Sequence, residues 1–207
     1  MSMRAGAQIR DRARRFARDR RGVAALEFAL IVPLLLCLYF VTMEVAQAIE
    51  TNKKVGRVGS MVADLVAQMQ EIPVSELEGI MRIGEATMQP YNRSKVDITV
   101  TAIEVTDEAS PKVQVVWSRK LVNGEPVAGA AKGSPVTGLP PALQIKGSFL
   151  IRAESSLSYQ PVLTWTAASA TTKSQLGLAA IFASIPMKDT YYLRPRRSNT
   201  IPCTGCY

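Results

Sequence analysis

The 207-residue sequence contains no histidine. Ser-His-Asp triads, Cys-His pairs and metal sites with histidine ligands are therefore excluded as functional centres. The sequence also lacks a glycine-rich phosphate loop, a paired-carboxylate signature and a nucleophile motif. We accordingly expect a protein that is not an enzyme, with no catalytic residue, no bound metal, no cofactor and no small-molecule substrate.

Cysteine is scarce, with three residues in the whole chain. Cys203 and Cys206 lie close together near the C-terminus, whereas Cys37 falls in a long apolar run. A zinc site needs four ligands, and a thioredoxin-like redox centre needs a βαβ context, so neither is expected. A small disulfide between Cys203 and Cys206 and two free thiols at a frayed end remain the alternatives. Cys37 is expected to act as a small apolar residue.

Charge is distributed unevenly along the chain. Residues 1–22 hold eight arginines and two aspartates, so most of the net charge of +8 belongs to this basic leader. Binding of nucleic acid by the remainder of the chain is therefore not expected. A cluster of arginines ahead of a membrane span predicts that the leader is cytoplasmic and that the C-terminal bulk lies on the opposite side.

A single long apolar run extends from Val23 to Met43, and its only charged residue is Glu27. These 21 residues would form a helix of about 31 Å, which is enough to cross a bilayer core. A secretory signal has a shorter apolar region that is followed by a small-residue cleavage site, and this run is longer and has no clean site of that kind after it. An uncleaved signal anchor is the simpler alternative to a chain that is processed before the run. Pro33 lies inside the run and removes a helical hydrogen bond. It is either the site of a kink or locally melted turn that helps the chain leave the bilayer, or an ordinary membrane-helix proline.

The motif RGVAALEFALIVPLLL, at residues 21–36, resembles the N-terminal domain of TadE-like proteins. These are minor pilins or pseudopilins of the Tad (Flp) branch of bacterial type IV pili. The resemblance covers roughly residues 20–48, about a seventh of the chain. Phe28 stands where the major Flp pilins usually carry tyrosine, which favours the minor class.

The resemblance implies how the start of this run is used. A prepilin peptidase would cut after Gly22, making Val23 the first residue of the mature chain and Glu27 the fifth. Glu27 would then meet the N-terminal amine of a neighbouring subunit and set its axial register. The alternative is an acid that snorkels to the membrane interface and is held there by Arg20 or Arg21. A carboxylate at the centre of a membrane helix costs roughly 2.5–3.5 kcal/mol, and less near the interface, so its presence requires a reason.

The resemblance further implies the partners and the location of the protein. The partners would be the prepilin peptidase, other Tad pilins, inner-membrane assembly proteins and the lipid bilayer. The protein would be a single-pass protein of the inner membrane, with its C-terminal domain in the periplasm or in the pilus. Its role would be structural, in pilus biogenesis, adhesion and biofilm formation. An uncleaved TadG-like scaffold of the same secretion apparatus is the first rival, and a membrane-anchored envelope enzyme is the second.

Beyond the run, apolar residues recur every three or four positions and predict that the helix continues. They are Val45, Ile49, Val55, Val58, Val62, Leu65, Val66 and Met69. Gly56 and Gly59 in this stretch indicate either a flexible joint or a close approach to the sheet. Ile72-Pro73 breaks the helix, and Ser75 with Glu78 predicts a capping box that starts a second helix, ending near Met88.

The period then changes to two, which is typical of half-buried strands. Strands are predicted at 96–102, 113–121, 149–159, 176–186 and 190–193, with the third pairing antiparallel with the second. A phase slip at residues 102–105 predicts a bulge or a strand end. Residues 122–147, rich in glycine and proline, predict a long loop.

The whole pattern predicts an α+β fold, in which an N-terminal transmembrane helix extends into a long amphipathic helix packed on an antiparallel sheet. The expected divisions are a leader (1–22), a membrane helix (23–43), a helical region (44–90), a β-rich domain (91–193) and a basic tail (194–207). The tail, with Arg194, Arg196 and Arg197, is expected to be solvated.

Overall fold

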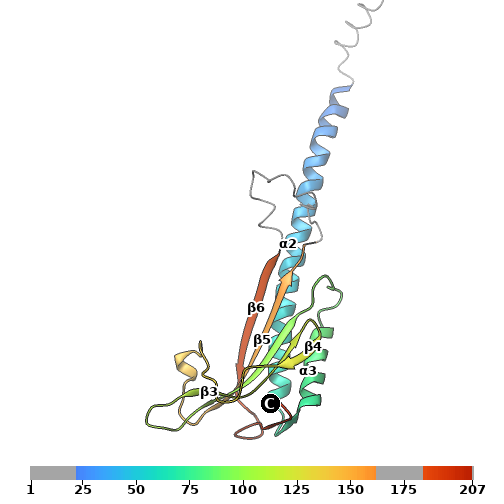
Figure 1. Cartoon of the computed structure of the whole chain (residues 1–207). Coiled ribbons are helices and arrows are strands. Elements are labelled where there is room, and N and C mark those ends of the chain that lie inside the picture. Colours follow the sequence, from blue (N-terminus) through green and yellow to red (C-terminus); the bar gives the residue numbers. More distant parts are fainter. Residues whose placement is uncertain (1–21, 162–183, 207) are drawn as a thin grey trace, which may run out of the picture. The chain divides into compact units, whose positions relative to one another are not determined.

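The computed structural model describes residues 22–161 and 184–206 and confirms the α+β fold (Figure 1). The chain divides into two compact units, Met1–Val45 and Ala46–Tyr207. Helix α2 (Val23–Ala67) contains the apolar run and its predicted continuation as one helix of 45 residues. The predicted strand 176–186 lies almost wholly outside the described residues, as does the leader apart from Gly22.

The second unit is built on a five-stranded antiparallel sheet with the order β4-β3-β2-β5-β6. Its strands are β2 (Asp97–Val105), β3 (Val113–Val122), β4 (Glu125–Ala128), β5 (Phe149–Tyr159) and β6 (Ile185–Leu193). The other elements are α3 (Val74–Ala86), the short 3₁₀ helix η2 (Pro141–Leu143) and a parallel pair formed by β1 (Ile72–Pro73) and β7 (Cys203–Thr204).

The predicted phase slip in the first strand is confirmed, because the register between β2 and β3 shifts between Ala102 and Ile103. The predicted pairing of the third strand was wrong: β5 pairs with β2 and β6 and not with β3. The segment 122–147 is also not entirely loop. Asn123 and Gly124 both have positive φ and close a tight hairpin that adds β4 to the edge of the sheet.

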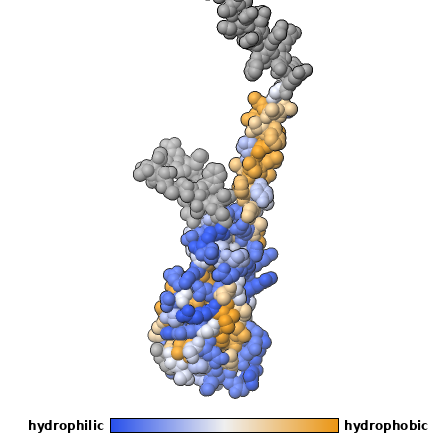
Figure 2. All heavy atoms as spheres, turned by 90° about the vertical axis from the view of Figure 1, so that its right-hand side faces the viewer, coloured by the Kyte–Doolittle hydropathy of each residue, from blue (hydrophilic) through white to orange (hydrophobic). Residues whose placement is uncertain are grey.

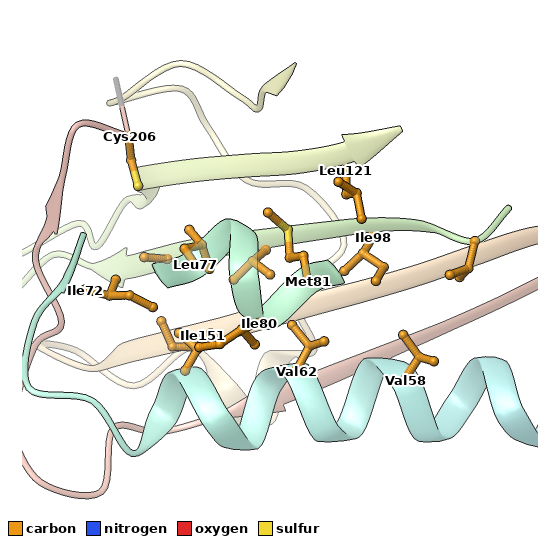
Figure 3. Close-up of a cluster of buried hydrophobic side chains, with 14 of the residues drawn as sticks. Val58, Val62, Ile72, Leu77, Ile80, Met81, Ile98, Leu121, Ile151 and Cys206 are labelled. Atoms are coloured by element: carbon orange, nitrogen blue, oxygen red, sulfur yellow. The ribbon is translucent and has the colours of Figure 1, made fainter. Parts of the chain in front are cut away.

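The main core lies between one face of this sheet and the two helices. Figure 3 shows Val58 and Val62 of α2 and Leu77, Ile80 and Met81 of α3 directed toward side chains of the strands. Burial of each such side chain contributes roughly 1.5–3 kcal/mol, which explains why the helical stripe faces the sheet. The stripe is buried at Val55, Val58, Val62 and Val66, but the predicted members Val45 and Ile49 are exposed.

The two glycines of α2 mark a close approach to the sheet. A Cβ added at Gly59 would lie 2.9 Å from Oγ of Ser155 and 3.0 Å from the ring of Tyr191. One added at Gly56 would lie 2.8 Å from Oδ2 of Asp189. The hydroxyl of Tyr191 donates a hydrogen bond to that carboxylate oxygen at 3.0 Å, and this bond, with burial and the carboxylate's charge, raises the pKa of Tyr191.

This contact makes a testable difference between two helical glycines. Gly59→Ala crowds the sheet, whereas Gly79→Ala in α3 places its methyl group in open space. Alanine is favoured over glycine in a helix by up to about 1 kcal/mol, and overpacking costs about 1–3 kcal/mol. We expect urea unfolding of the detergent-solubilised protein to show that Gly79→Ala raises the free energy of unfolding. The free energy of unfolding of Gly59→Ala should be about 1–3 kcal/mol lower than that of Gly79→Ala. Equal effects of the two changes would contradict the close approach.

The predicted capping box is wrong. The N-cap of α3 is Pro73, and no side chain caps the helix. Glu78 instead accepts hydrogen bonds from Nε and Nη2 of Arg119 at 2.9 and 2.6 Å. A carboxylate that can pair with an arginine of the sheet gains a charge-assisted contact stronger than a cap bond to a backbone N–H.

The C-terminal tail is neither frayed nor wholly solvated. The backbone N–H of Arg196 donates to the carbonyl of Ala67 at 2.9 Å, and the Arg196 side chain pairs with Asp64. Ile201 is fully buried, and its carbonyl accepts a hydrogen bond from Nε1 of Trp117 at 2.7 Å. The tail therefore belongs to the core of the second unit.

Candidate functional site

The residues singled out from the sequence stand at the start of α2. Gly22 directly precedes the helix and is exposed, and a Cβ built on it would meet no described atom within 4 Å apart from those of its own chain neighbourhood. The helix begins at the next residue, Val23. The Gly22–Val23 bond is therefore at the junction between a described helix and the basic leader.

Glu27 lies four residues into the same helix, one turn from its start, and is exposed. Among the described residues, no cation lies within ion-pair distance of its carboxylate. Arg20 and Arg21, which could hold it by snorkelling, are outside the described residues. The neighbouring Phe28 has 70% of its surface exposed.

The remainder of this part of α2 is an uncovered apolar surface, coloured orange in Figure 2. Large apolar side chains are exposed at Leu26, Phe28, Leu30, Ile31, Leu34, Leu35, Leu36, Leu38, Tyr39, Phe40, Val41 and Met43. Burying these twelve would gain on the order of 20 kcal/mol, since each contributes roughly 1.5–3 kcal/mol. Such a surface requires lipid or other apolar helices around it.

α2 is the one described helix long and apolar enough to cross a membrane. This finding fits a single-pass membrane protein. The helix is unbroken through Pro33, so the free chain has no melted turn there. Cys37, in the same segment, is exposed and unpaired, which fits an apolar residue facing lipid.

Cys203 and Cys206 lie at the opposite end of the chain in the second unit. The structure joins them in a disulfide with Cα atoms 5.7 Å apart, and both residues are buried. Cys203 belongs to β7, which pairs with β1, and Ile72 of β1 donates its N–H to the carbonyl of Pro202 at 3.0 Å. The pair therefore closes a small loop that fixes the tail beside the end of α2.

Sequence reasoning did not identify the side chains that attach the tail and the turn after α3. Besides Trp117, these include Arg93, whose guanidinium lies 5.0 Å from the ring centroid of Tyr91 and 5.5 Å from that of Tyr159. The contacts of Trp117 with Ile201 and of Arg93 with Tyr159 join segments far apart in the sequence, so no local pattern predicts them. Within the described residues, no group of three or more acidic or cysteine side chains could hold a metal ion.

Comparison with known proteins gives one family match. The model of the TadE-like protein family matches residues 22–63, about a fifth of the chain. No curated protein and no solved structure matches the chain. The matched region begins at Gly22 and includes Glu27, Phe28, Pro33 and the first part of α2 that packs on the sheet. Residues 22–63 thus show a TadE-like family match, consistent with a TadE-like protein of the Tad pilus system.

Proposed function

We propose that the chain is a minor pilin or pseudopilin of a Tad pilus, processed after Gly22 and acting structurally in pilus assembly. The observation that supports this most is the start of α2. An accessible glycine precedes a helix whose apolar surface is uncovered and whose only acid in the membrane run stands four residues beyond the first helical position. A membrane helix that also packs against neighbouring subunits requires this kind of surface.

In this proposal the prepilin peptidase removes residues 1–22 and creates a cationic amine at Val23. Glu27 of one subunit pairs with that amine of another, because a buried carboxylate is tolerable when a cation neutralises it. Phe28 and the apolar residues that follow pack side by side with other Tad pilins and inner-membrane assembly proteins. Pro33 loosens the helix when it leaves the bilayer, and adhesion and biofilm formation follow from the assembled pilus.

The proposed orientation places the arginine-rich leader in the cytoplasm and the second unit in the periplasm. A disulfide between Cys203 and Cys206 agrees with that side, since disulfides persist in oxidising compartments. The TadE-like family is structural rather than catalytic, and we infer the same for this chain. An uncleaved TadG-like scaffold of the Tad apparatus is the rival that an experiment must distinguish.

The intact mass of the protein extracted from its native membrane tests the proposal. We expect a chain that begins at Val23, having lost residues 1–22. Gly22→Leu should remain full length, because a bulky side chain prevents close approach of the peptidase to the backbone. Gly6→Leu, in the same leader, is the matched control and should be processed normally. Recovery of the native chain beginning at Met1 would favour the uncleaved scaffold.

A further inference from the structure

The face of the sheet opposite the main core carries a polar hollow of about 270 Å³. Most of the residues that line it alternate, along the four longest strands, with residues that face the main core, as the two-residue period of a strand requires. Those that matter here are Thr101 of β2, Ser118 and Lys120 of β3, Arg152 and Glu154 of β5, and Lys188 of β6.

The floor of the hollow is firmly built. Thr101 and Ser118 are cross-strand partners, and both are almost fully buried. Their hydroxyls lie 3.0 Å apart, and Ser118 also donates to the carbonyl of Val100 at 3.2 Å. Gly129 of the segment after β4 lies so close that a Cβ there would overlap the side chain of Ser118. Its N–H donates to the carbonyl of Ser118 at 3.1 Å, so the loop is held against the sheet.

Positive charge exceeds negative charge around this floor. Three cations, Lys120, Arg152 and Lys188, line the hollow together with one carboxylate, Glu154. Glu154 lies 3.1 Å from Nζ of Lys188 and 3.5 Å from Nε of Arg152. Within residues 22–161 and 184–206, Lys120 has no ion-pair or hydrogen-bond partner through its side chain.

Arg152 is incompletely satisfied. Its Nε is buried, and the contact with Glu154 does not have the geometry of a hydrogen bond, so this N–H has no acceptor in the described part of the chain. A buried donor without an acceptor costs roughly 1–3 kcal/mol, more when the group is charged. An anion in the hollow would relieve this cost and would neutralise Lys120.

We propose that this hollow binds a compact oxyanion, which is a phosphate, sulfate or carboxylate group. Its volume accommodates such a group, and Lys120 and Arg152 supply charge-assisted donors. No aromatic side chain is among the described residues that line the hollow. The site lies entirely in the second unit and is independent of processing at Gly22.

Binding is tested on the full-length protein in uncharged detergent, by titration with inorganic phosphate followed by amide chemical shifts. We expect saturable shifts in β3 and β5 that sodium chloride of equal ionic strength does not produce. Lys120→Gln should weaken binding roughly tenfold, the effect of losing one hydrogen bond to a charged group. Lys146→Gln, which removes an exposed lysine elsewhere, is the control and should bind as the unchanged protein does.

Glu154→Gln should tighten phosphate binding, because it removes the carboxylate that opposes the anion. A gain in affinity of this kind is not an effect of misfolding. A parallel titration with acetate distinguishes the two sources of the group: saturation by acetate in preference to phosphate assigns the site to a carboxylate. The proposal would be overturned if neither phosphate nor acetate saturates the site, or if chloride produces identical shifts. So would equal binding by Lys120→Gln and Lys146→Gln.

Discussion

Glu27→Ala is expected to abolish incorporation of the chain into a pilus while leaving its insertion into the membrane intact. In the proposed assembly, the change leaves the amine of Val23 on the neighbouring subunit buried and unpaired. Loss of one partner of a buried ion pair costs about 3–5 kcal/mol, roughly a hundredfold to a few thousandfold in the equilibrium for subunit addition. Removal of a carboxylate from the apolar run makes insertion easier, so the two readouts separate.

The measurement compares the amount of the chain in the membrane fraction with the amount recovered in sheared pili. Glu27→Gln should fail like alanine, because it removes the charge and keeps the shape. Glu71→Ala, which removes an exposed acid from the second unit, should assemble normally. Normal pilus content in the Glu27→Ala strain would remove the proposed role of this residue and leave the snorkelling alternative.

Combining Glu27→Ala with Gly22→Leu tests whether the acid acts through the new amine. Where the neighbouring subunit is another copy of this chain, Gly22→Leu leaves that neighbour without the amine that Glu27 meets, so there is no such pair to lose. The double variant should therefore assemble no worse than Gly22→Leu alone, which is the non-additivity expected of two changes that remove the same contact. A further loss in the double variant would show that Glu27 has another partner.

The parts of the fold that the sequence predicts are those governed by periodic burial. The 21-residue apolar run predicts the first part of α2. The alternation in 96–102, 113–121 and 149–159 predicts three strands. Both predictions are possible because each face of a helix or strand meets one environment. Even the bulge in β2 follows, since a slip in phase moves side chains to the other face. The partner of each strand does not follow, because alternation describes a face and not a neighbour.

Polar residues interrupt the alternation in two of these strands, and the alternation alone does not predict their partners. Arg119 and Ser155 stand at positions where their strands would otherwise place apolar residues in the core. Arg119 pairs with Glu78 of α3, and the hydroxyl of Ser155 donates to the carbonyl of Val55 in α2 at 2.8 Å. Each interruption is thus the place where a helix is attached to the sheet. Glu78, which pairs with Arg119, was wrongly predicted to cap a helix because its spacing from Ser75 matches a capping box.

The candidate functional residues also fall into two groups: those that a local sequence pattern reveals and those that only the fold brings together. Gly22 and Glu27 are visible in the sequence because a glycine between a basic leader and an apolar run, and an acid within that run, are locally anomalous. The oxyanion hollow is not visible, since its residues come from four strands and its floor depends on the segment that contains Gly129. Period two identifies the outer face of the sheet, but the burial of Thr101 and Ser118 on that face depends on contacts over long sequence distances.

Trp117→Ala is expected to cause the largest loss of stability in the second unit. Trp117 is 1% exposed, and its indole N–H holds the carbonyl of Ile201, 84 residues away, at 2.7 Å. Truncation of a buried tryptophan costs about 3–5 kcal/mol, a large share of the 5–15 kcal/mol that stabilises a typical domain. Urea unfolding of the detergent-solubilised protein, followed by circular dichroism, should show this loss. The exposed edge residue Val127, changed to alanine, should alter stability by less than about 0.5 kcal/mol.

Trp117→Phe separates the packing of the ring from the attachment of the tail. It keeps most of the apolar volume but leaves the carbonyl of Ile201 buried without its donor, which costs about 1–3 kcal/mol. In a chain ending at Arg194, that carbonyl is absent, so the same change should cost close to nothing beyond its lost volume. If Trp117→Phe is equally costly with and without the tail, the hydrogen bond does not hold the tail. The other contacts of the tail must then fix it; they include the disulfide, the pairing of β7 with β1 and the bonds of Arg196 to Ala67 and Asp64.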